Sequence, residues 1–209
     1  MGKPIKQLRL DDTKLLQIFT QFVDLTKTIE SEHNRESIAH LLDDMGEAFF
    51  AAPASGRAMY HNCFPGGLCE HSLRVYSIFK NLCDTYGTDF KHDDILIASL
   101  FHDLGKAGTS EKPFYVPKNS DWHAKNMGLY YENNPDLRYM PHAQRSLQTL
   151  SEYDVELSND VYTGILIHDG QYVAENKPYA MQEGKFAILL SMADRLACEI
   201  EKEKWLAIQ

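Results

Sequence analysis

The sequence predicts an all-α protein. Apolar residues recur at the three- and four-residue spacing of helices along most of the chain, and no segment alternates apolar and polar residues as a half-buried strand would. The 209 residues include 44% hydrophobic and 24% charged residues, which is an ordinary composition for a globular protein. A chain of this length and composition is expected to form one compact unit.

Two helices are predicted before the first proline. Residues 12–30 carry an apolar stripe and follow Asp11, which together with Asp12 and Thr13 can cap the first turn. A second apolar pattern begins after Asn34 and ends before Pro53. We interpret residues 1–56 as an N-terminal helical extension or lid that packs beside the mouth of the active-site cleft, and residues 57–209 as the main domain.

The rest of the chain is divided by glycines and prolines. After a loop at 53–67, helices are predicted from about 67 to Gly87, from 93 to 104, from Pro141 to about 150, from Ser158 to Gly170 and from about 183 onward. The segment 108–121 is expected to be irregular and 122–131 weakly helical. The helix at 93–104 is almost continuously apolar, which indicates a central, buried position.

Charge and cysteine content restrict the partners and the compartment. The formal net charge of −9 disfavours long nucleic acid, whereas a small phosphate ester stays possible because bound cations dominate the field of a cleft. Cys63, Cys69, Cys83 and Cys198 form no CxxC pair and are predicted to be reduced. The longest apolar run, 95–101, is too short to cross a membrane. We therefore expect a cytoplasmic protein.

The candidate functional residues interrupt apolar helices. His102 and Asp103 end the most apolar predicted helix, and His71, His168 and Asp194 lie on the apolar stripes or ends of three others. A His-Asp pair by itself is usually a surface cap, and a single buried histidine is usually a hydrogen-bonded core residue. Together, however, imidazole and carboxylate groups on four apolar helices indicate a site for manganese, iron, cobalt or zinc.

Three motifs resemble the HD-domain superfamily of metal-dependent phosphohydrolases. They are GGLCEHS at 66–72, LFHDLGK at 100–106 and MAD at 192–194. The resemblance covers residues from about 57 to 200 and implies that His71, His102, Asp103 and Asp194 bind a divalent ion.

The resemblance also implies a second ion. Asp103 bridges two ions in the binuclear members, which add two histidines between the central pair and the last aspartate. His142 and His168 stand in that interval, so we expect two ions, with manganese, iron, cobalt and magnesium as candidates. His123 competes with His142 for this role. His33, His40 and His92 match no motif position and are not assigned to the site.

Two cations in such a site indicate the chemistry. Two cations would activate a water molecule and neutralise the phosphoryl oxygens, with Asp103 holding the ions and Lys106 contacting the phosphate. For Lys106 an ordinary helix-terminal lysine is the alternative. The other candidate contacts to the substrate are His61, Arg74, Tyr172 and Lys177, with Arg195 as a weaker one.

Three functions are compatible with these residues. The first is hydrolysis of a phosphomonoester or phosphodiester in a small nucleotide-type substrate. The second is a 3′-to-5′ exonuclease on short single strands, since the Gly66-Gly67-Leu68 turn is similar to that of HD-domain exoribonucleases. The third is a non-catalytic module that binds metal or nucleotide; the complete ligand set argues against it.

Overall fold

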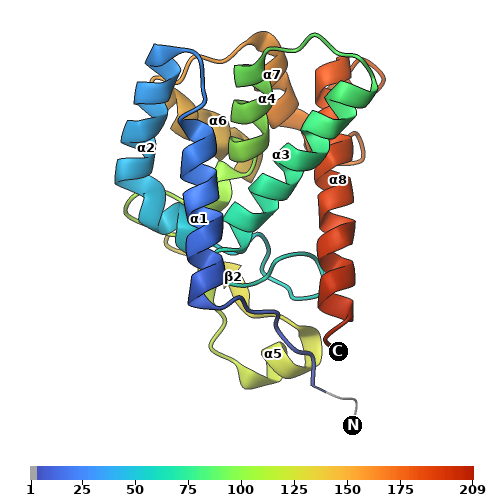
Figure 1. Cartoon of the computed structure of the whole chain (residues 1–209). Helices are drawn as coiled ribbons and strands as arrows, with labels where there is room; N and C mark the ends of the chain where they lie inside the picture. Colours follow the sequence, from blue (N-terminus) through green and yellow to red (C-terminus); the bar gives the residue numbers. More distant parts are fainter. Residues whose placement is uncertain (1–3) are drawn as a thin grey trace.

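The structure is a computed structural model that describes residues 4–209. It is predominantly helical, as predicted (Figure 1). The α-helices are α1 Asp12–Thr26, α2 Glu32–Ala51, α3 Gly67–Thr85, α4 His92–Phe101, α5 Asp121–Met127, α6 His142–Glu152, α7 Asn159–Ile167 and α8 Lys185–Leu206. Two 3₁₀ helices, η1 Leu104–Ala107 and η2 Ala174–Tyr179, accompany them.

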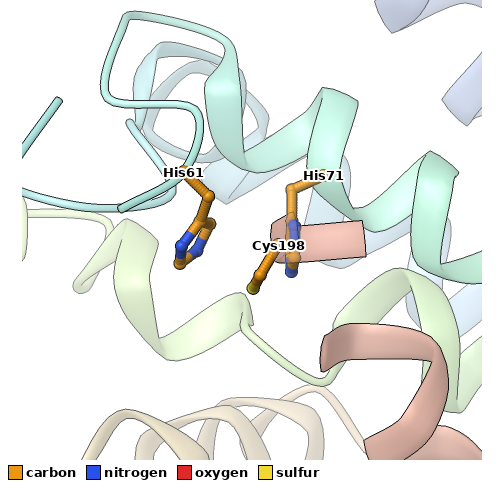
Figure 2. A group of neighbouring side chains, drawn as sticks. All are labelled: His61, His71 and Cys198. Atoms are coloured by element: carbon orange, nitrogen blue, oxygen red, sulfur yellow. The ribbon is translucent and has the colours of Figure 1, made fainter. Parts of the chain in front are cut away.

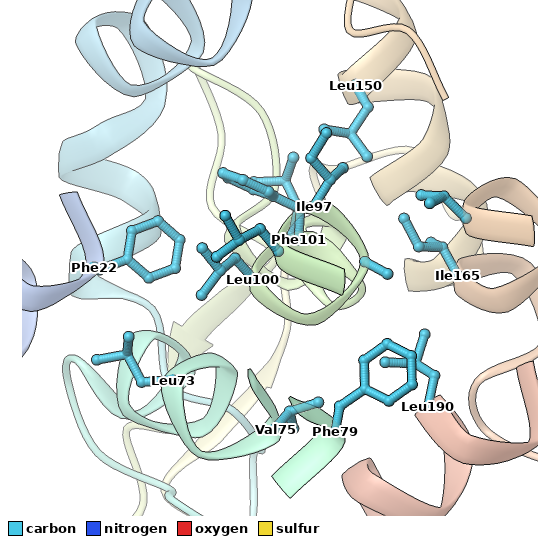
Figure 3. Packing of buried hydrophobic residues seen from close by; sticks show 14 of the residues in the cluster. Phe22, Leu73, Val75, Phe79, Ile97, Leu100, Phe101, Leu150, Ile165 and Leu190 are labelled. Atoms are coloured by element: carbon cyan, nitrogen blue, oxygen red, sulfur yellow. The ribbon is translucent and has the colours of Figure 1, made fainter. Parts of the chain in front are cut away.

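Helix α4 lies at the centre of the fold. Its residues from Leu96 to Phe101 are all buried, which agrees with the continuously apolar sequence predicted to form a central helix. It packs against α1, α3 and α7. Figure 3 shows Ile97, Leu100 and Phe101 of α4 surrounded by apolar side chains of the neighbouring helices. The end of α4 therefore delivers the residues that follow it, His102 and Asp103, into the interior.

The first two helices share this core. Asp11 caps α1 by accepting a 2.8 Å hydrogen bond from the amide of Lys14. Helix α2 is capped by Ser31, so it begins earlier than the pattern after Asn34 predicted. The ring of Phe22 on α1 lies 4.9 Å from Phe49 on α2 and 5.6 Å from Phe101 on α4, measured between centroids. Helices α1 and α2 are thus packed into the same apolar cluster as α4.

A small antiparallel sheet was not predicted. Strand β1, Tyr115–Pro117, pairs with β2, Tyr131–Asn133, on either side of the short helix α5. Three residues are too few to show a strand alternation, which is why the sequence pattern missed them. None of the helices in residues 4–209 combines the length and the apolar character that crossing a membrane requires.

Candidate metal centre

The predicted ligands come together in the interior from separate helices. His71 lies on α3, His102 and Asp103 follow α4, His142 is the first residue of α6, His168 follows α7, and Asp194 lies on α8. His71 and His102 are fully buried, and Asp103 and His168 are only 1% exposed. Burial of so many ionisable groups is unfavourable unless they satisfy one another or a bound cation.

The first set of ligand atoms is formed by His71, His102 and Asp194. Nε2 of His71 is 3.0 Å from Oδ1 of Asp194, and Nε2 of His102 is 3.9 Å from the same oxygen. Oδ2 of Asp103 lies 3.7 Å from Nε2 of His71 and 3.5 Å from Nε2 of His102. Two imidazole nitrogens and two carboxylates therefore face a common point.

The second set lies on the other side of Asp103. Its Oδ1 atom is 3.3 Å from Nε2 of His142 and 3.3 Å from Nε2 of His168. Oδ2 of Asp169 is 3.2 Å from Nε2 of His142. The two oxygens of one carboxylate thus face two different pairs of histidines. Asp169 was not predicted, although it follows His168 directly, just as Asp103 follows His102.

Hydrogen bonds on the far side of the rings aim the histidines. Nδ1 of His102 donates to the carbonyl of Ser99 at 2.9 Å, and Nδ1 of His168 donates to the carbonyl of Ile165 at 2.8 Å. Both acceptors lie three residues earlier, among the carbonyls that a helix end leaves without an amide partner. A proton on Nδ1 leaves Nε2 with its lone pair, so these rings present a ligand atom to the centre.

Several of these ligand atoms have no hydrogen-bond partner. They are buried Nε2 atoms of His71, His102 and His142, and Oδ1 of Asp103. Unpartnered buried polar atoms are rare in folded proteins and need an explanation. Divalent cations fit these atoms, since neutral imidazole and carboxylate are suitable donors for manganese, iron, cobalt or zinc.

Burial and neighbouring charges shift the pKa values of the histidines and carboxylates in the site. Burial lowers the pKa of His102 to about 4, so this ring is a neutral donor. Burial also lowers the pKa of His71, but Glu201 and Asp194 outweigh it and raise the pKa to about 10. Burial alone would raise the pKa of Asp194, yet the neighbouring histidines hold it well below its usual range. Cation binding would replace the protons that compensate these carboxylates.

The comparison with known families agrees with this geometry. A family model for the HD domain matches residues 68–198, which contain every ligand described above. The chain belongs to the HD-domain family. HD domains generally belong to metal-dependent hydrolases, in line with the resemblance. A search of curated proteins and a search of solved structures found no significant match.

Lys106 lies inside the centre of this HD domain. Its Nζ is 2.6 Å from Oδ2 of Asp103, and the side chain is 11% exposed. Burial would lower the pKa of this ammonium, but Asp103 outweighs burial and raises it. Lys106 is therefore a largely buried cation at the carboxylate of Asp103, and not a solvated lysine at a helix end.

A cavity of about 1150 Å³ lies next to the centre. Three of the predicted substrate contacts, His61, Lys106 and Tyr172, line it together with His168 and Asp194. Arg195 also lines it. These residues come from the loop before α3, from η1, from the segment after α7 and from α8. The cavity thus joins the metal centre to solvent.

Other residues expected at this cavity are not among those that line it. Arg74 does not line it; its guanidinium instead pairs with Glu70 at 2.9 Å and with Glu201 at 3.1 Å. Lys177 on η2 is also outside the lining. No residue of α1 or α2 contributes; α1 packs against α3 and α4, and α2 packs against α3 and η1.

Of the two histidines considered for the second set, His142 has the better geometry. His123 lies on α5, where its Nδ1 is 2.7 Å from the hydroxyl of Ser120. Among residues 4–209, His123 belongs to none of the groups whose atoms lie close enough to share a cation, whereas His142 forms such a group with His168 and Asp169.

Sequence reasoning also missed Glu201. This carboxylate is fully buried on α8 and lies 3.1 Å from Nδ1 of His71. The signal was present, because Glu201 occupies an apolar position seven residues after Asp194, on the same face of the helix. All four cysteines are free, in agreement with the prediction of reduced thiols.

Proposed function

We propose that the protein is a phosphohydrolase that uses two divalent cations to cleave a phosphomonoester or phosphodiester of a small nucleotide-type substrate. The observation that carries the proposal is the position of Asp103. Each of its two carboxylate oxygens faces a separate pair of histidines, which is the arrangement a carboxylate shared by two ions requires.

The residues divide into two ligand sets. His71, His102, Asp103 and Asp194 would hold the first ion. Asp103, His142 and His168 would hold the second, with Asp169 next to it. Bound divalent cations would supply an activated water at neutral pH and neutralise the phosphoryl oxygens. Manganese, iron, cobalt and magnesium are the candidates.

The protein's own groups would orient the reaction. The carbonyls of Ser99 and Ile165 fix the rings of His102 and His168, so their ligand nitrogens keep their direction when substrate enters. Lys106 holds Asp103 by an ion pair and lines the cavity, where its ammonium can also meet a phosphate oxygen.

The cavity suits a mononucleotide or a dinucleotide. Its volume of about 1150 Å³ is just above the usual range of small-molecule pockets. Tyr60, Tyr172 and Tyr179 line it and are at least 37% exposed, so they offer aromatic faces for a base. Arg195 and Lys202 also line it, and both pair with Glu199 of the same lining. The net charge of −9 opposes long strands.

A substrate screen tests the proposal. Purified protein loaded with manganese is incubated with nucleotides, dinucleotides, cyclic nucleotides and short oligonucleotides, while released phosphate and nucleoside are measured. Asp103→Asn is the matched inactive control, because it keeps the shape and removes the charge. We expect release from one of the small substrates by the wild type alone.

The same screen separates the alternatives. Stepwise release of mononucleotides from oligonucleotides, in preference to the small substrates, would favour the exonuclease. Metal binding without hydrolysis of any substrate would favour the non-catalytic module. Elemental analysis showing no bound metal would contradict both the proposed enzyme and a metal-binding module.

A further inference from the structure

A third group of ligand atoms lies beside the proposed hydrolytic centre. His61 in the loop before α3, His71 on α3 and Cys198 on α8 place one ligand atom each within 4.8 Å of one another. Figure 2 shows the two imidazoles and the thiol turned toward a common space. The ring centroids of His61 and His71 are 5.0 Å apart. The proposed hydrolysis assigns no role to the thiol.

The atoms of this group have unsatisfied bonding capacity. Nε2 of His61 and Nε2 of His71 are both buried without a hydrogen-bond partner, and His71 is fully buried. Sγ of Cys198 lies 3.6 Å from Oδ1 of Asp194, which itself is 3.0 Å from Nε2 of His71. The group offers two nitrogens and one sulfur, and Asp194 adds a carboxylate oxygen next to His71 and Cys198.

This donor set matches zinc better than the hard cations. Thiolate and imidazole with a single carboxylate are typical tetrahedral zinc ligands, whereas magnesium and manganese prefer oxygen. Ligand atoms of a tetrahedral zinc site are about 3.5 Å apart. Atoms that already lie within 4.8 Å of one another need only small side-chain movements to reach those positions.

We propose that His61, His71 and Cys198, with Asp194 as the fourth ligand, bind one zinc ion that excludes the first hydrolytic ion. The exclusion follows from His71. Its Nδ1 is held by Glu201, so only Nε2 can bind a metal, and one lone pair serves one cation. Zinc at this position would therefore inhibit the enzyme. The inhibition rests on the proposed function, but the zinc site does not.

Cobalt reports on the thiol directly. Co²⁺ is added to metal-free protein, and thiolate-to-cobalt absorption in the near ultraviolet is recorded. We expect a saturable band in the wild type that is lost in Cys198→Ala and weakened in His61→Ala. Cys83→Ala is the matched control, since Cys83 is a buried core thiol outside the ligand groups of residues 4–209. Absence of the band in the wild type, or its survival in Cys198→Ala, would overturn the proposal.

A displacement experiment tests the exclusion without measuring hydrolysis. Protein loaded with manganese is titrated with zinc, and released manganese is followed by electron paramagnetic resonance. We expect about one manganese ion to leave per zinc bound, and Cys198→Ala to need at least about tenfold more zinc. Zinc binding with all manganese retained would refute the exclusion. Equal displacement in Cys198→Ala would mean that zinc merely takes the hydrolytic position, and the proposed site would fail.

The two experiments keep the proposals separate. If the protein binds no manganese, the proposed hydrolytic centre fails, while the cobalt band still decides whether the thiol site exists. If manganese binds and supports hydrolysis but no thiolate band forms, the zinc site fails and the proposed function stands.

Discussion

Glu201 and His71 form a fully buried hydrogen bond between α8 and α3, with Nδ1 of His71 3.1 Å from Oε2 of Glu201. Arg74 donates to the other oxygen of Glu201, also at 3.1 Å. Arg74, which was expected to contact phosphate, therefore orients the carboxylate of Glu201. That carboxylate in turn orients the candidate metal ligand His71. Partners of this kind fix the ring and increase its basicity.

Glu201→Gln should weaken binding of the first ion by about 10- to 100-fold, because the amide is a weaker acceptor for Nδ1 of His71. Manganese titration followed by calorimetry measures the change. Glu203→Gln is the control, since Glu203 is exposed on the same helix and should leave the affinity unchanged. Wild-type affinity in Glu201→Gln would show that the hydrogen bond does not tune this ligand.

His102→Ala or Asp103→Ala should lower the rate of phosphate-ester hydrolysis by more than about 100-fold. Each variant should also lower metal occupancy while the helices stay folded. Circular dichroism and elemental analysis accompany the rate measurement. Asp103→Ala leaves the buried ammonium of Lys106 without its partner, so Asp103→Asn is measured beside it. Normal turnover with bound metal in either alanine variant would refute the site assignment.

His142→Ala and His168→Ala should each lower the metal content from about two ions per chain towards one and leave the ion at His71 and Asp194. Elemental analysis after exhaustive dialysis gives the count. Asp169→Asn tests whether Asp169, which was not predicted from the sequence, contributes to the second ion. His123→Ala is the control and should leave the metal content unchanged. Two ions retained in both the His142 and His168 variants would contradict the second ligand set.

Gly105→Ala should destabilise the fold by about 1–3 kcal/mol and weaken the second ion, since an added Cβ would lie 2.1 Å from the carbonyl oxygen of His142. Urea unfolding and manganese titration measure the two effects. Gly46→Ala is the control, because the nearest atom there is 3.6 Å away and alanine favours a helix. Equal stabilities of the two variants would show that α6 simply moves aside.

Mononucleotide- or dinucleotide-sized esters should be cleaved far faster than long single strands. A long strand meets a surface with net charge −9 beyond the cavity, and that repulsion is screened by salt. Specificity constants for a short ester and a twenty-nucleotide strand at two salt concentrations provide the measurement. Faster cleavage of the strand at low salt, declining as salt rises, would indicate a basic track and support the exonuclease.

The sequence predicted the ligand helices well because each ligand interrupts an apolar pattern. His71, His102, His168 and Asp194 stand where a core side chain was expected, and their helices formed with small shifts at the ends. The choice of His142 over His123 needed the fold, since both histidines follow the central pair and only the direction of α6 brings one of them to Asp103.

Residues that act through contacts between helices were harder to predict. Arg74 shares a helix face with His71, which suggested the cleft, but its charge is taken up by Glu70 and Glu201. No local sequence pattern predicts that α1 and α2 lie away from the cavity. An apolar stripe predicts that a helix is buried, but it does not identify the helices against which it packs. For the same reason, the sequence did not predict that His61 and Cys198 lie close together.

The main apolar core connects metal binding to the thermal stability of the protein. Side chains of α1, α2, α3, α4, α6, α7 and α8 belong to one buried cluster, and the candidate ligands stand on or just after five of these helices. An ion that binds only the folded chain raises the free energy of unfolding by about 2.7 kcal/mol when its free concentration is one hundred times its dissociation constant. The melting temperature should therefore rise with metal concentration, so a thermal shift assay can rank candidate cations before any substrate is known.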